Sequence, residues 1–364
     1  MLKINYYILC YGDKYLDKLI NFSLPSFFKK KPSNFDSFKH TIILFTHKSS
    51  LKKSYQRKIS NFFYEKQINY KLLDFKTHNQ NKINKISVWR LLGFFQKKII
   101  IDAYKKNSIC VQISPDEIHS INLWSVILDK ITHTNMIVLP SNEILLDYIK
   151  KDLIRLQKNN IDITEDVLLK IKFKSLKKSY HELFFNNNFY KKHCPRYYFQ
   201  IGNNIYYKNI HLSPIALNPK ACIKNSLYLN FKNIYNFDTS LGNKFLNQYT
   251  IYPQEALLLS LEDTKDQSDN IFRENNLFFL FLKRIYFQLI FIIKNVDGIN
   301  SFNYLKTFSV NNGYKKNNNL NIKYFFNFFL FSYINFFFSV FFLLVYYFLK
   351  ITKKLVLFFI FRKK

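Results

Sequence analysis

Polar side chains follow four of the strands that the sequence predicts, and these positions are the best candidates for chemistry. In open α/β sheets, ligands bind beyond the carboxyl ends of the strands, so the first residues after each strand face the ligand. In chain order they are Tyr11, Gly12 and Asp13, then Thr46 and His47, then Asp116 and Glu117, and finally Ser141 and Asn142.

The adjacent carboxylates Asp116 and Glu117 are the most informative of these. They follow residues 109–113, Ile-Cys-Val-Gln-Ile, which read as a buried strand. Carboxylates at that edge could hold a divalent cation bridging a diphosphate, or orient a sugar hydroxyl. Asp116 could instead cap a helix predicted over 118–130, because its oxygens can accept bonds from first-turn amides. Both interpretations stand at this point.

The sequence lacks the motifs of several common types of active site. The chain has no Walker loop, GxGxxG turn, HExxH or GxSxG, which removes the simplest ATPase, dehydrogenase, metalloprotease and hydrolase readings, and no organic cofactor is expected. The spacing of His193, Cys194 and His211 is unlike a standard zinc site. Four widely spaced cysteines with no CxxC pair fit a reducing compartment: Cys10, Cys110, Cys194 and Cys222.

The elements that must position these residues alternate between short β-branched or aromatic runs and amphipathic stretches, which is typical of a mostly parallel sheet wrapped by helices. Strands are predicted at 6–10, 41–46, 70–75, 108–113 and 135–139, and helices at 14–27, 51–65, 86–104 and 118–130. Beyond them we expect helices over 142–192, short strands and loops over 194–252, and an acidic linker or surface loop over 260–276.

The amino-acid composition indicates which classes of binding partner to expect. A net charge of +31 would ordinarily indicate nucleic acid or anionic lipid. The basic residues nevertheless occur as scattered pairs and triplets, such as 29–31 and 177–178, and the heavy use of Phe, Lys, Asn and Tyr reads as A/T-rich codon bias. We therefore expect a solvated, lysine-rich surface with some attraction to an anionic membrane, and no nucleic acid partner.

A C-terminal membrane anchor is predicted. Residues 325–349 carry no formal charge over 25 positions, which at about 1.5 Å per residue exceeds a hydrocarbon core of ~30 Å. A buried core helix is the alternative. Residues 277–293 are apolar but contain charges, so an interfacial helix is predicted there. The N-terminal apolar run is too short for a signal peptide, so we expect the remainder to face the cytoplasm at the cell membrane.

Four short patches within residues 5–265 carry a resemblance to a known family. They are Tyr11-Gly12-Asp13-Lys14-Tyr15 with Leu24-Pro25-Ser26, Ser114-Pro115-Asp116-Glu117, His211-Leu212-Ser213-Pro214, and Phe237-Asp238-Thr239. In that order they resemble the W-G-x-x-Y-like turn, the acidic Pro-Asp position, the H-x-x-P segment and the acidic strand end beyond it in bacterial glycosyltransferase-like proteins of the nucleotide-diphospho-sugar transferase type.

The resemblance implies an α/β, GT-A-like fold: a nucleotide-sugar-binding domain over 1–265, a linker over 266–323 that includes the interfacial helix, and the membrane segment over 324–364. It also implies roles for individual residues. Asp116 and Glu117 would bind the donor and take the place of a motif for Mg²⁺ or Mn²⁺, Asp238 would be a general base, and His211 would lie near the acceptor. The remaining donor contacts would be Tyr11, Gly12, Asp13 and Thr46.

The implied function is a hexosyltransferase of cell-surface polysaccharide biosynthesis, moving a sugar from a nucleotide-sugar donor to a lipid-linked or surface-glycan acceptor. The chain departs from the family in lacking a D-x-D motif, so metal dependence is open and Lys or Arg could neutralise the leaving diphosphate instead. Two alternatives remain: an inactive relative, and a non-enzymatic membrane-anchored protein that binds anionic lipid or nucleic acid through its basic surface.

Overall fold

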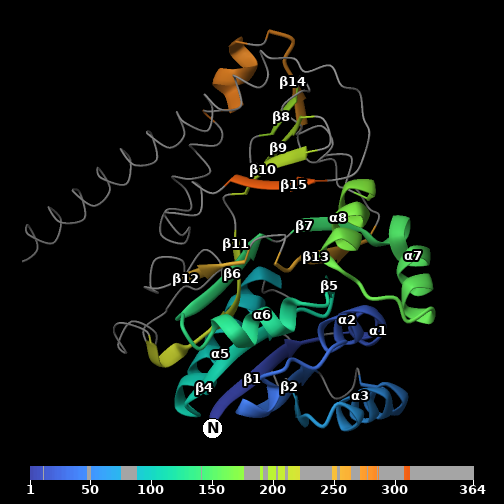
Figure 1. Ribbon diagram of the computed structural model, residues 1–364, viewed down its shortest axis with the longest axis vertical. Coiled ribbons are helices and arrows are strands. Elements are labelled where there is room, and N and C mark those ends of the chain that lie inside the picture. The colour runs from blue at the N-terminus through green and yellow to red at the C-terminus, as the bar shows by residue number, and fades with distance from the viewer. Residues whose placement is uncertain are drawn as a thin grey trace, which may run out of the picture. The chain divides into compact units, whose positions relative to one another are not determined.

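The computed structural model describes residues 1–10, 12–46, 51–74, 88–140, 142–175, 189–191, 196–201, 204–209, 212–221, 248–251, 255–263, 271–276, 278–284, 286 and 307–311. These residues belong to two compact units (Figure 1). The first comprises residues 1–177 and 212–266, and the second comprises 178–211 and 267–364. The boundaries near 265 and 323 drawn from the sequence remain predictions.

A seven-stranded sheet forms the centre of the first unit, in the order β12-β6-β11-β4-β1-β2-β3. Neighbouring strands are parallel except at β11, which runs antiparallel to both β4 and β6. This mostly parallel sheet with flanking helices fits the GT-A-like, nucleotide-sugar transferase type of fold (Figure 1). The strands are β1 Leu2–Leu9, β2 Phe38–Thr46, β3 Asn69–Asp74, β4 Ser108–Ile113, β6 Met136–Pro140, β11 Leu212–Leu217 and β12 Gln248–Thr250.

The inner strands are apolar because the sheet buries them on both faces. In β1 the side chains of Ile4, Tyr6, Tyr7 and Ile8 are all buried, so inward and outward positions alike are filled by large apolar groups. Asn5 is the polar exception, and its Nδ2 donates to Ser108 Oγ of β4 over 2.9 Å. The strands predicted from such runs are therefore confirmed, with β1 and β2 starting a few residues earlier than expected.

The short strands predicted over 194–252 are confirmed, but the sequence did not indicate that one of them, β11, lies inside the central sheet. Its sequence, Leu-Ser-Pro-Ile-Ala-Leu, contains Pro214, which has no amide hydrogen to donate to a ladder. The pairing with β6 shifts register between Pro214 and Ala216, and this irregularity accommodates the proline. A proline in an apolar run argues against a central strand, which is why the sequence pattern was misleading here.

Helices flank the sheet, and the first of them is not uniform. The predicted helix 14–27 consists of α1 Asp13–Lys18, a π-helical segment η1 Leu19–Ser23 and α2 Leu24–Phe27. Single π-helical segments are rare and occur often at functional sites. The other elements of this kind are η2 Phe35–Ser37, α3 Lys53–Glu65, α5 Val88–Lys105, α6 Leu123–Lys130, α7 Leu146–Lys158, α8 Glu165–Lys174 and η4 Pro219–Ala221.

A smaller sheet, β5-β13-β7, corrects three further predictions. The strand β5, Glu117–His119, occupies the start of the predicted helix 118–130, so Asp116 caps no helix there. The strand β7, Asn142–Leu145, replaces the start of the predicted helical region. The strand β13, Leu258–Glu262, replaces the start of the predicted acidic linker, because its leucines are buried between β5 and β7.

An aromatic hydrogen-bond relay crosses the core. Trp124 Nε1 donates to the hydroxyl of Tyr6 over 2.8 Å, and that hydroxyl lies 2.9 Å from Nδ1 of His40. The remaining ring nitrogen, His40 Nε2, lies 2.8 Å from the carbonyl oxygen of Phe35. All groups are satisfied if the Tyr6 hydroxyl donates to Nδ1 and Nε2–H donates to Phe35, which assigns a neutral His40 tautomer. The His40 ring also stacks on Phe35 at 3.9 Å between centroids.

The neutral state of His40 makes stability depend on pH. Burial lowers the pKa of His40, while the bond to the Phe35 carbonyl opposes the shift. The unfolded chain takes up a proton near pH 6.5 and the folded chain does so only at lower pH, so the free energy of unfolding decreases as pH falls below about 6.5. One such proton contributes a slope of at most about 1.4 kcal/mol per pH unit.

Urea unfolding at pH 7.5, 6.5 and 5.5 tests this dependence. We expect His40→Gln to be less stable than the parent chain at pH 7.5 but to lose less stability on acidification. Equal slopes in the two proteins would show that His40 is not the titrating group.

The second unit contains two small antiparallel ladders. One has the order β15-β10-β9, from β9 Arg196–Ile201, β10 Asn204–Asn209 and β15 Thr307–Asn311, and the other pairs β8 Phe189–Lys191 with β14 Ile271–Arg273. The strand β8 lies inside the region predicted to be helical up to 192, which is a further correction.

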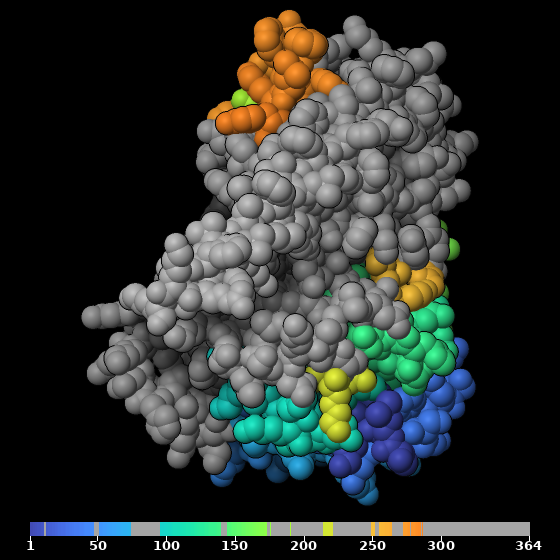
Figure 2. Space-filling model, turned by 90° about the vertical axis from the view of Figure 1, so that its left-hand side faces the viewer, coloured from blue at the N-terminus to red at the C-terminus, as the bar shows by residue number. Residues whose placement is uncertain are grey.

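The predicted membrane elements fall largely outside the described residues. Residues 278–284 are helical, and Figure 2 shows this part of the chain in orange at the molecular surface. Phe278 and Phe279 are 65% and 53% exposed. That this helix lies at a membrane interface stays a prediction. The rest of that helix and the segment 325–349 lie outside the described ranges. Within those ranges, no helix combines the length and the apolar character needed to cross a membrane.

Candidate functional site

The strands β4, β1 and β2 end level with one another. In register, Ile8 of β1 pairs with Ile113 of β4, and Leu9 pairs with Phe45 of β2. Because these strands are parallel, the residues that follow them gather at one edge of the sheet, as the sequence predicts. The described site residues at this edge are Gly12, Asp13, Thr46, Asp116 and Glu117, whereas Tyr11, His47, Ser141, His211 and Asp238 lie outside the described residues.

The turn after β1 is shaped by a glycine. Gly12 has φ 84° and ψ 156°, a conformation that side-chain-bearing residues rarely adopt. Apart from its chain neighbours, a Cβ added at Gly12 would meet no heavy atom of the described residues within 4 Å, so the backbone conformation is what favours glycine here.

An ion pair joins the ends of the first two strands. Asp13 begins α1, and its Oδ2 accepts from Nζ of Lys52 over 2.6 Å. Lys52 immediately precedes α3, which follows β2. The two side chains are 47% and 65% exposed, so the pair adds little stability. Its position matters more, because it brings an ammonium group to the edge where β1 and β2 end.

Thr46 leaves a hydrogen-bonding group unused at this edge. The residue is 1% exposed, and its Oγ1 has no hydrogen-bond partner among the described residues. A buried hydroxyl without a partner costs about 1–3 kcal/mol, so such groups are uncommon away from ligand sites. This observation agrees with the donor contact that the family resemblance implies for Thr46.

The acidic turn after β4 is held in place by its own hydrogen bonds. Ser114 Oγ donates to Asp116 Oδ1 over 2.8 Å, and Ser114 N donates to Glu117 Oε2 over 3.2 Å. The amide of Leu261, in β13, donates to the backbone oxygen of Asp116 over 2.7 Å. The strand β13 of the small sheet thus holds the backbone of the turn in place, and the sequence did not predict this strand.

The charge of Asp116 reaches the turn after β1. Burial raises the pKa of the Cys10 thiol, and the nearby negative charge of Asp116 raises it further. Burial likewise raises the pKa of the Tyr15 phenol, with Asp116 again the next contribution. The register of β1, β2 and β4 brings the ends of these strands together. A pocket shared by the acidic turn and the loop after β1 stays a prediction, as do the positions of His211 and Asp238 relative to it.

A buried lysine secures the helix at this edge. Lys18 of α1 is 5% exposed, and its Nζ donates to the Leu261 carbonyl over 2.7 Å and lies 3.2 Å from Asp263 Oδ2. Lys14 pairs with the same carboxylate. Although partial burial opposes it, these two ammonium groups hold the pKa of Asp263 below its usual range. Sequence reasoning missed both Lys18 and Asp263, since each looks like an ordinary surface charge.

Asp116 and Glu117 keep part of their capacity to bind a cation. One oxygen of each carboxylate already accepts a bond from Ser114, and Glu117 Oε2 also lies 3.4 Å from Nε2 of His119. Among the described residues, no three His, Cys, Asp or Glu side chains come together as ligands. Mg²⁺ is commonly held by one or two carboxylates together with substrate phosphates and water, so Mg²⁺ or Mn²⁺ dependence stays a prediction.

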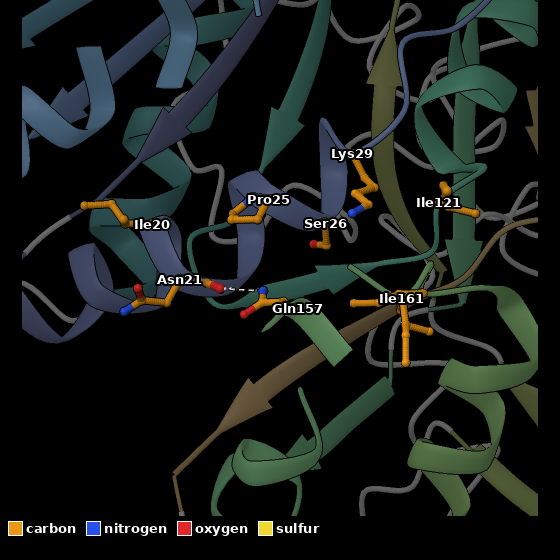
Figure 3. A pocket seen from close by; sticks show the side chains of 9 residues that line it. Ile20, Asn21, Pro25, Ser26, Lys29, Ile121, Gln157 and Ile161 are labelled. Atoms are coloured by element: carbon orange, nitrogen blue, oxygen red, sulfur yellow. Dashed lines mark hydrogen bonds between the residues drawn. The ribbon is translucent and has the colours of Figure 1, made fainter. Parts of the chain in front are cut away.

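A cavity of about 310 Å³ lies elsewhere in the first unit (Figure 3). None of the site residues predicted from the sequence lines it. It is bordered by η1, by α2 and Lys29 two residues beyond it, by the turn before α6, by the end of α7 and by the connection to α8. The lining residues are Ile20, Asn21, Pro25, Ser26, Lys29, Ile121, Gln157, Ile161 and Ile163.

Comparison of the sequence with known proteins does not identify a family for this chain. No protein-family model and no curated protein matches the chain. Among solved structures, it is similar to Staphylococcus aureus TarS residues 1–349, with 12% identity, 39% of this chain and 36% of that chain covered, and a TM-score of 0.27. The same fragment in complex with UDP-GlcNAc gives 13% identity, 40% and 35% coverage, and a TM-score of 0.26.

Mouse xyloside xylosyltransferase 1 in its apo form is also similar, with 8% identity, 44% of this chain and 59% of that chain covered, and a TM-score of 0.27. This chain thus spans only about a third of the TarS fragment and less than two thirds of the mouse enzyme. Likenesses with such TM-scores carry no functional argument, so the proposals below depend on the geometry of the chain itself.

Proposed function

We propose that the chain is a glycosyltransferase that binds a nucleotide-sugar donor at the edge where β4, β1 and β2 end. The observation that carries the proposal is the position of Asp116. Asp116 lies three residues beyond Ile113 of β4, which pairs with Ile8 of β1, so it follows β4 at the edge where β1 and β2 also end. The glycine turn after β1 and the buried hydroxyl of Thr46, which has no hydrogen-bond partner among the described residues, support the same edge as a binding site.

Different side chains at this edge have different proposed roles in donor binding. Ser114 holds Oδ1 of Asp116, which leaves Oδ2 to accept a bond from a donor hydroxyl. Lys52 is positioned by Asp13 and brings positive charge toward a diphosphate, whose negative charge grows as the bond to the sugar breaks. Lys52 could do this without Mg²⁺ or Mn²⁺, so no step is assigned to a metal ion. Asp238 as the general base and His211 near the acceptor complete the proposal.

The proposed acceptor is a lipid-linked or cell-surface glycan, and the proposed sugar is a hexose. The uncharged segment 325–349 supports this choice, because a membrane anchor keeps the enzyme beside an acceptor that is itself in the membrane. The proposed location is the cytoplasmic side of the cell membrane.

Donor binding is the direct test. The full chain in an amphipathic polymer is titrated with a panel of UDP-, GDP-, CDP- and dTDP-sugars, and donor hydrolysis is followed in parallel. We expect one nucleotide class to bind more tightly than its free monophosphate, and to do so in EDTA, because lysine rather than metal would neutralise the diphosphate.

Folded protein that responds to no donor would contradict the proposal. Binding that collapses with salt, and extends equally to anionic vesicles and nucleic acid, would favour the basic binding protein instead. Donor binding without hydrolysis or transfer to any acceptor would favour an inactive relative.

A further inference from the structure

We infer that the cavity bordered by η1, α2 and the α7–α8 connection binds a small amphiphilic anion, with an apolar body and one carboxylate or phosphate group. Its volume, about 310 Å³, lies at the lower end of known ligand sites. The inference goes beyond donor binding and does not depend on it, because none of the lining residues belongs to the edge described above.

The lining is apolar with a single cation. Ile20, Ile121, Ile161, Ile163 and Pro25 supply aliphatic surface, and none of the described residues that line the cavity is acidic. Burying such surface against a hydrocarbon chain is favourable by about 0.8 kcal/mol per methylene, which is about fourfold in affinity. The apolar body of the ligand follows from this composition.

The cation is Lys29, and its charge is not neutralised. Its ammonium group donates to the side-chain oxygen of Asn160, which is a neutral acceptor. No ion pair joins Lys29 to a carboxylate among the described residues. Figure 3 shows the ammonium directed toward the space that Ser26 and Ile161 border. Lys29 as a whole is half-buried and its ammonium group is accessible to solvent, so an anion seated on the apolar lining could reach it.

Hydrogen bonds between the elements that line the cavity fix their positions in the absence of a ligand. Gln157 Nε2, at the end of α7, donates to the Asn21 carbonyl of the π-helical segment over 2.6 Å (Figure 3). Ser26 is 4% exposed, donates to the Ser23 carbonyl over 3.0 Å and accepts from the His119 amide over 3.1 Å. Cross-links of this kind favour a preformed site, which binds without a large ordering cost.

Binding of alkyl phosphates and carboxylates to the full chain in an amphipathic polymer tests the inference. We expect octyl phosphate or octanoate to bind by calorimetry, with about a fourfold loss for each methylene removed, and inorganic phosphate not to bind. Preference for phosphate indicates a lipid phosphate as the source of the ligand, and preference for carboxylate indicates a fatty acid.

Two matched pairs of variants locate the site. Lys29→Gln should weaken octyl phosphate binding about tenfold or more while leaving octanol unaffected, and Lys30→Gln, at an exposed position outside the lining, should change neither. Ile161→Asp places a negative charge at the cavity, and Ile154→Asp places one on α7 outside the lining; these residues are 45% and 37% exposed, so both variants should fold.

Equal binding by Ile161→Asp and Ile154→Asp, or by Lys29→Gln and Lys30→Gln, would overturn the inference. Asp116→Asn separates it from the donor proposal, because that change should abolish donor binding and leave octyl phosphate binding intact. A chain that binds octyl phosphate through Lys29 but binds no donor would keep the cavity site and remove the sugar-transfer function.

Discussion

Asp116→Asn lowers kcat/KM for sugar transfer by roughly 100-fold or more, and this is the largest effect on activity that we expect from a single substitution. The amide has nearly the same size as the carboxylate, and its oxygen can still accept from the Ser114 hydroxyl that now bonds Oδ1. What disappears is the negative charge beside Cys10 and Tyr15, and with it the charged acceptor for a donor hydroxyl.

Steady-state kinetics with the preferred donor measure this effect, and Asp129→Asn is the matched control. Asp129 lies in α6, its side chain is 62% exposed, and it pairs with Lys130 on the surface. Thermal unfolding of both variants establishes whether the fold is retained. If a folded Asp116→Asn protein turned over donor as fast as the Asp129→Asn control, Asp116 would have no place in the site.

Tyr6→Phe lowers the free energy of unfolding by about 2–5 kcal/mol. Removal of one hydroxyl leaves two buried groups without their partner: Trp124 Nε1–H loses its acceptor and His40 Nδ1 loses its donor. Each unsatisfied group costs about 1–3 kcal/mol, and the ring packing of Tyr6 against Phe28 and Trp124 is retained in the variant.

Chemical denaturation of Tyr6→Phe beside Tyr64→Phe gives the measurement. Tyr64 is on α3 and 86% exposed, so the loss of its hydroxyl should change stability by less than about 0.5 kcal/mol. The near-ultraviolet circular dichroism of Trp124 should also change in the Tyr6 variant alone. Similar stabilities for the two variants would mean that the relay contributes nothing to folding.

The part of the fold that sequence predicts best is the part whose pattern is local. The strands β1, β2 and β4 are continuous apolar runs, and each is followed by an amphipathic helix or a polar turn, so their existence and order are evident from the residues alone. Because these strands are parallel neighbours, their carboxyl ends lie at one edge of the sheet. The sequence alone therefore predicts that Asp13 and Asp116 lie at the same edge.

The remaining elements depend on partners that are remote in the chain. The three-residue strand β5 forms because β13, about 140 residues later, offers a free edge, and Glu117 therefore enters a strand instead of a helix. The strand β11 likewise depends on a remote partner, because it pairs with β6 in spite of its proline, and the sequence near Pro214 does not indicate this pairing. Lys18 is buried because a backbone carbonyl and Asp263 meet it in space, and no periodicity within α1 reveals either partner.

The position of β11 has a consequence for the order in which the chain folds. The strand β6 has β11 and β12 as its neighbours in the sheet, and these begin at residues 212 and 248, while β6 ends at 140. During synthesis, β4, β1, β2 and β3 have their mutual pairings available early, whereas β6 must wait for more than seventy further residues. Such long-range pairing slows folding and leaves an apolar strand exposed meanwhile, so nascent chains at this stage are the form most prone to aggregate.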